Sequence, residues 1–203
     1  LSGGQLTVGT GVTIGIAGIA TFRSGRIDVG DSLFNTSIGE LAGDAITTGA
    51  QNTGVGYNAL SANTTGSYNV AIGDNALSAN TTAESHVAVG NNALAANTTG
   101  DSNTAVGGNA LDANTTGDSN TAVGRHALGA NTTASNNVAV GKNALLSNTT
   151  GAQNIAVGAF SLDANTTAND NVAIGHVALT SNITGTQNTA VGSFSLEDNT
   201  ANY

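Results

Sequence analysis

Short runs that alternate large and small apolar residues, each followed by a glycine, recur every 17 residues from residue 35 onward. Val70–Gly73 is a typical run, in which the alternation predicts a short β-strand and the glycine predicts a sharp corner after it. The residue before each run is Asn in nine units, and His86 takes its place in the tenth. The spacing therefore divides residues 35–203 into ten units, the last of which lacks one residue.

We number the positions of each unit from 1 to 17, starting at this leading residue. Position 5 is Gly in all ten units, position 4 is always Val or Ile, and position 9 is Leu in every unit except the first, which has Gly43. Position 6 varies freely, which is typical of a side chain in water. Most units also carry Asn-Thr-Thr followed by Gly or Ala at positions 12 to 15, and such poor helix formers at a fixed interval argue against a helix.

These positions predict an all-β fold, a parallel β-solenoid or β-roll of about ten 17-residue rungs. Each rung would hold one or two short strands and two turns, and ten rungs at about 4.8 Å would form a stack about 48 Å long. Stacking would place identical residues above one another, so we expect hydrogen-bonded asparagine ladders at positions 1 and 12. His86 and His126 replace Asn at two different positions, where they would extend a ladder or project into solvent.

Residues 1–34 do not follow the 17-residue spacing. Leu6 and Val8, and then Val12, Ile14 and Ile16, alternate with small or polar residues, which predicts short strands. We interpret residues 1–34 as an N-terminal β shaft or cap and residues 35–203 as the solenoid. A cap would cover the strand edges at an open end of the solenoid.

The composition excludes several classes of partner. Only 8% of the residues are charged and 3% are aromatic, there is no Cys, and the net charge is −9. Nucleic acids and anionic membrane surfaces attract clustered Lys and Arg, so neither is an expected partner. The chain has no stretch of 18 apolar residues that would span a bilayer, and it offers no thiolate for a disulfide or a metal site.

A typical rung offers two large aliphatic side chains at fixed positions, 4 and 9, together with a few alanines. This is little apolar surface for 17 ordered residues, which favours a thin roll that shares apolar surface with neighbouring chains. Position 3 is Ala in eight of ten units, and we expect these alanines to allow the close approach of another chain near an axis. A homotrimer is the expected arrangement.

Two families share these patterns. The run Asn69–Ala79 resembles the head repeat of trimeric autotransporter adhesins, a left-handed parallel β-roll with three chains to a head. The longer run Asn103–Gly117 resembles repeats of tail fibre proteins from tailed phages, and Leu6–Phe22 resembles their shaft sequence. The resemblance to tail fibres implies a trimeric fibre on the virion that is used in host attachment. It brings no catalytic residues and no cofactor.

The resemblance leaves two other functions open. A bacterial surface adhesin head of the same type would bind matrix or glycans outside the cell or at the bacterial surface. A tailspike that cleaves glycans would need two carboxylates in one groove, and nothing fixes a pair among Asp163, Asp170 and Glu197. We therefore do not expect an enzyme.

No metal site is expected either, because His86, His126 and His176 fall at positions 1, 7 and 6 of separate units. The Asn-Thr-Thr triplets match the N-glycosylation pattern, but their periodicity already accounts for them as turns.

The variable position 6 offers the candidate residues for surface contacts. Lateral contacts with a host glycan or receptor are predicted there, from Tyr57, Arg125, Lys142 and His176. Position 7 is most often Asn, and Phe160 and Phe194 depart from it near the C-terminal end. These two aromatic residues would mark a changing diameter or a contact with a further module downstream.

Overall fold

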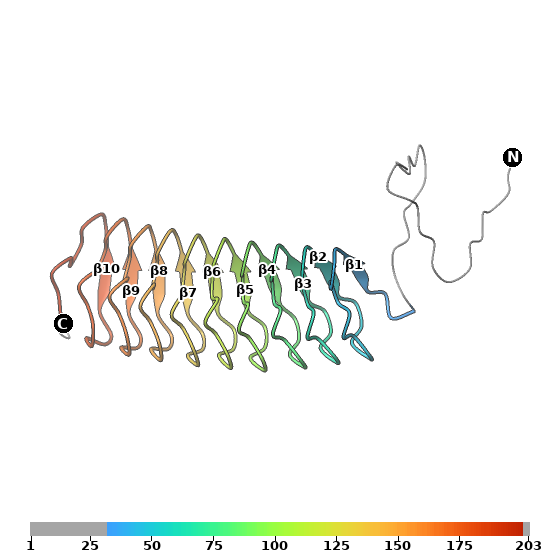
Figure 1. Cartoon of the computed structure of the whole chain (residues 1–203). Helices are drawn as coiled ribbons and strands as arrows, with labels where there is room; N and C mark the ends of the chain where they lie inside the picture. Colours follow the sequence, from blue (N-terminus) through green and yellow to red (C-terminus); the bar gives the residue numbers. More distant parts are fainter. Residues whose placement is uncertain (1–31, 201–203) are drawn as a thin grey trace, which may run out of the picture.

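The computed structural model describes residues 32–200 and shows a rod of stacked rungs, each with one three-residue strand (Figure 1). This confirms an all-β parallel solenoid with about 17 residues per rung. The predicted shaft or cap over residues 1–34 lies almost wholly outside the described residues. The strands are β1 (Thr36–Ile38), β2 (Thr53–Val55), β3 (Val70–Ile72), β4 (Val87–Val89), β5 (Thr104–Val106), β6 (Thr121–Val123), β7 (Val138–Val140), β8 (Ile155–Val157), β9 (Val172–Ile174) and β10 (Thr189–Val191).

The ten strands form one parallel sheet in chain order, and every described pair is offset by one repeat unit. Ile72, for example, pairs with Val89 on the next rung. Equivalent residues therefore lie directly above one another, as the repeat predicts. At about 4.8 Å between neighbouring strands, the nine spacings from β1 to β10 give a sheet about 43 Å long.

The glycine at position 5 forms a corner that other residues cannot form. All ten of these glycines have φ between 126° and 139°, a region that L-residues rarely adopt. The rungs also approach closely here, because a Cβ added to Gly107 would lie 2.7 Å from both the carbonyl carbon and the oxygen of Gly124. Glycine is thus required at this position for two reasons: the backbone has a positive φ, and the next rung leaves no room for a Cβ atom.

The strands turn their small residue inward and their large residues outward. Ala105 at position 3 is completely buried, whereas Val106 at position 4 is 36% exposed. Position 4 therefore does not supply the core, and the expectation that the position 3 alanines meet another chain is wrong. Alternate strand residues point to opposite faces, and the narrow interior has room for a methyl group but not for Val or Ile.

The apolar core runs the length of the rod as three stacked columns, at positions 3, 8 and 9. Ala at positions 3 and 8 packs with Leu at position 9 in a single cluster. The position 9 leucines have φ between 49° and 56°, a left-handed conformation that costs free energy and that packing maintains here. The fully buried leucines are Leu60, Leu77, Leu94, Leu111, Leu128, Leu145, Leu162 and Leu179.

Buried asparagines fill the other side of the interior. At position 12 they form the predicted ladder, in which the Nδ2 of Asn80 donates to the Oδ1 of Asn63 at 2.8 Å. At position 1 they bond mainly to backbone: the Oδ1 of Asn35 accepts the N–H of Asn52 at 2.8 Å, and the Nδ2 of Asn52 donates to the carbonyl of Gly66 at 2.9 Å. These bonds satisfy buried backbone groups that the short strands leave unpaired.

Candidate functional site

The residues predicted to make surface contacts all lie at position 6, directly after the glycine corner. Tyr57, Arg125, Lys142 and His176 are exposed, as expected for a variable position. Their role in contacts stays a prediction. The structure brings Lys142 and His176 into one group with neighbouring aromatic residues, and it leaves Tyr57 four rungs away from Arg125.

Position 7 completes this group. Its residues have φ near 60°, which suits Asn, and the Nδ2 of Asn58 donates to the Oδ1 of Asn75 at 2.8 Å. Asn92 and Asn109 form a second such pair, and the sequence analysis predicted neither. Phe160 and Phe194 replace Asn here. The ring of His176 lies between the two phenyl rings, with edge-to-face geometry and centroid distances of 6.3 Å to Phe160 and 5.3 Å to Phe194.

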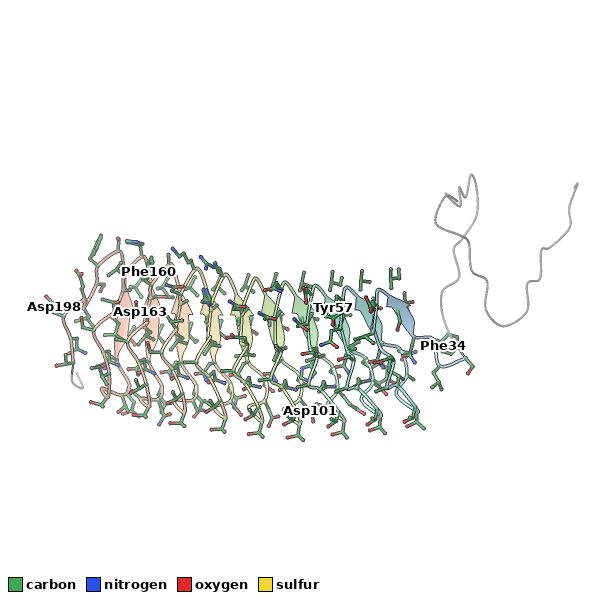
Figure 2. The ribbon with its side chains drawn as sticks, viewed as in Figure 1. Phe34, Tyr57, Asp101, Phe160, Asp163 and Asp198 are labelled. Carbon is green, nitrogen blue, oxygen red and sulfur yellow. The ribbon has the colours of Figure 1, made fainter. Side chains whose placement is uncertain are left out.

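A cation extends the group toward the N-terminal end of the rod. The Nζ of Lys142 lies 5.3 Å from the centroid of the Phe160 ring, within the range of a cation–π interaction. Position 7 of one rung lies beside position 6 of the rung before it, because the backbone N–H of Phe160 donates to the carbonyl of Lys142 at 3.0 Å. Arg125 lies one further rung back. We call Arg125, Lys142, Phe160, His176 and Phe194 the basic-aromatic row. Figure 2 labels its central member, Phe160, toward the upper edge of the rod.

The charge around this row differs from the rest of the chain. Arg125 and Lys142 are the only Lys or Arg residues in the range 32–200, and no Asp or Glu occupies position 6 or 7 from Arg125 onward. Three acids of consecutive rungs, Glu84, Asp101 and Asp118, lie at position 16. Asp101 is labelled at the lower edge of the rod in Figure 2. The row is thus a local cationic feature on a chain of net charge −9.

The stacked acids at position 16 have a structural role. The Oδ1 of Asp101 accepts the backbone N–H of Glu84 at 2.8 Å, and the Oδ1 of Asp118 accepts that of Asp101 at 2.7 Å. Within residues 32–200 no three His, Cys, Asp or Glu side chains are grouped so that they could hold a metal ion. Two acids at position 10 are also partly enclosed by the fold. Asp163 accepts a hydrogen bond from the hydroxyl of Thr180 on the next rung. Burial raises the pKa of the Asp112 carboxyl above its ordinary value.

His86 extends the position 1 ladder and does not project into solvent. Its side chain is completely buried, and its Nδ1 accepts the N–H of Asn103 at 3.1 Å, as the Oδ1 of Asn does on other rungs. Burial lowers the pKa of His86 below its ordinary value, an effect that the nearby carboxylates of Asp101 and Asp118 oppose only in part. The neutral ring is therefore the form that the fold accommodates.

This burial predicts an acid-sensitive stability. Because the folded-state pKa of His86 is lowered, its contribution is fully present above the unfolded value of about 6.5 and is lost as the pH falls through and below that value. We expect the thermal midpoint, followed by circular dichroism, to fall between pH 7 and pH 5. His86→Asn, which restores the consensus residue, should reduce this fall, whereas His176→Asn at an exposed position should not. An equal fall in all three proteins would contradict the assignment.

Among the described residues there is no helix with the length and apolar character needed to cross a membrane. Comparison of the chain with protein-family models, with curated proteins and with solved structures finds no match.

Proposed function

We propose that this chain is a structural and attachment protein, the repeat segment of a phage tail fibre that forms a rigid extended rod for host binding. The observation that supports this most directly is the continuity of its ladders. Backbone pairing and the position 12 asparagines join successive rungs along the stack, so no flexible linker interrupts residues 35–199. A rod joined in this way holds whatever lies at its two ends at a fixed separation.

The outward face of the sheet is the surface that we assign to self-association in a homotrimer. Eight Val or Ile side chains at positions 2 and 4 are between 36% and 65% exposed, and none of the ten strands contains a charged residue. Chains of net charge −9 repel one another, so they approach most easily where the acids are absent. The acids at positions 10 and 16 lie outside the strands that form this face. We therefore assign contact between chains to this outward face and not to the position 3 alanines, which are buried within the rod.

Light scattering tests the association. The wild-type chain should have three times the mass of one 19.7 kDa chain. Lysine at two adjacent outward positions, Val106→Lys with Val123→Lys, should give monomers, because like charges would face one another in the desolvated interface. Thr116→Lys, at an exposed position outside the strands, is the matched control and should remain trimeric. A wild-type monomer, or a trimeric double variant with an unchanged circular dichroism spectrum, would refute this interface.

Immunogold electron microscopy tests the function. Antibodies raised against residues 32–200 should label the tail fibres of virions in the source material. Label confined to a bacterial envelope would instead indicate a surface adhesin, and new reducing ends after incubation with host polysaccharide would indicate a tailspike. Either result would overturn the proposal.

A further inference from the structure

We propose that the basic-aromatic row binds an acidic polysaccharide that carries carboxylate groups. This inference rests on the proposed attachment function and names the class of ligand for it. It concerns Arg125, Lys142, Phe160, His176 and Phe194, which occupy five consecutive rungs at positions 6 and 7.

The aromatic part of the row has no function in packing the interior. Position 7 accepts Asn on five of the described rungs, and the apolar core lies at positions 3, 8 and 9. The ring of Phe194 is 55% exposed, and His176 beside it is also exposed. Aromatic rings that remain in water offer faces of negative potential, which attract the C–H groups on the flat side of a sugar ring.

The basic part determines the charge of the ligand. Arg125 presents a planar guanidinium that matches a carboxylate, and Lys142 adds a second positive charge on the next rung. Acids elsewhere on the rod repel an anionic polymer, which directs it to this edge. A neutral glycan would gain nothing from either cation, so the observations favour an acidic one.

The stacking of the rungs sets the direction of the ligand. Successive members of the row are about 4.8 Å apart along the rod, a spacing similar to the length of one sugar ring in an extended chain. Cations come first and aromatic rings follow toward β10. A polysaccharide lying parallel to the rod would place one carboxylate near each cation and stack its following rings on the aromatic side chains.

Binding to polygalacturonate, measured by isothermal titration with the full chain, tests this inference. Wild type should bind polygalacturonate and should not bind dextran, which is neutral. Phe160→Asn with Phe194→Asn restores the consensus residue at both positions and should weaken binding about tenfold or more, and Arg125→Ala with Lys142→Ala should do the same. Tyr68→Ser is the matched control, because it removes an exposed aromatic side chain at position 17, outside the row, and gives the residue that the next three units have there; it should bind like wild type.

Each outcome decides a separate point. Absence of binding by wild type, equal binding of dextran, or undiminished binding by both double variants overturns the inference. A change of oligomeric mass in the Phe→Asn variant would show that the row contacts a second copy of the chain, which also overturns it. Virion labelling without polygalacturonate binding would support the attachment function and reject the acidic polysaccharide as its ligand. Polygalacturonate binding with label confined to cell envelopes would support this ligand and reject the proposed tail fibre.

Discussion

Replacing Gly107 with alanine is expected to lower the free energy of unfolding by about 3 kcal/mol or more. The new methyl group would lie 2.7 Å from the carbonyl of Gly124, and alanine would have to adopt a φ of 139°. To relieve this clash the backbone of Gly107 or of Gly124 would have to shift, and such a shift would disrupt the strand pairing between the two rungs. For a chain of this size the loss corresponds to a fall of about 6–12 °C in the thermal midpoint.

The neighbouring residue supplies the control. A Cβ added to Gly108 meets no atom within 4 Å, and this glycine does not have a positive φ. Gly108→Ala is therefore expected to change the midpoint by no more than about 2 °C, since surface changes are usually worth less than about 0.5 kcal/mol. Similar midpoints for the two alanine variants in thermal melts would show that the corner is not constrained in this way.

Leu111→Ala is expected to have the second large effect, a loss of about 2–5 kcal/mol in the free energy of unfolding. The side chain is completely buried in the apolar core of the described rod, and the neighbouring rungs are fixed by their backbone bonds, so the cavity cannot close. Urea denaturation followed by circular dichroism measures the loss.

The same substitution at Leu146 provides the comparison. Leu146 is a half-buried leucine at position 10, outside the core columns, and Leu146→Ala should cost about 1 kcal/mol or less. Equal losses at the two positions would mean that position 9 does not form the core.

The fold could be predicted because the repeat specifies its own register. Glycine at position 5 and asparagine at positions 1 and 12 indicate corners and ladders whatever the interior contains. The direction of the strand residues could not be predicted, because alternation alone does not say which set faces inward. Hydrophobicity favoured Val106 over Ala105 as the core residue, but the interior is too narrow for a branched side chain next to Leu111.

The left-handed conformation of the position 9 leucines also carried no signal. Leucine rarely adopts positive φ, and only Gly43, which replaces it in the first unit with a φ of 59°, hints at the backbone requirement. The large residue remains in the other units because burying it outweighs the local strain.

The candidate site was predictable in parts but not as a group. The variable position 6 identifies Lys142 and His176 as candidates, and Phe160 and Phe194 depart from the usual Asn at position 7. A comparison of identical positions would not pair them, because the turn is staggered: the N–H at position 7 donates to the carbonyl at position 6 of the preceding rung. This offset places Phe160 next to Lys142.

The hydrogen bonds of the rod connect nearest neighbours only. Each strand pairs with the one before and the one after it, and ladder bonds reach 17 residues along the chain at most. Duplication or loss of a whole unit in the gene would therefore restore the strand pairing and the position 12 asparagine ladder at the new junction. The length of such a rod can change during evolution in increments of one rung while the pairing between the remaining rungs is kept.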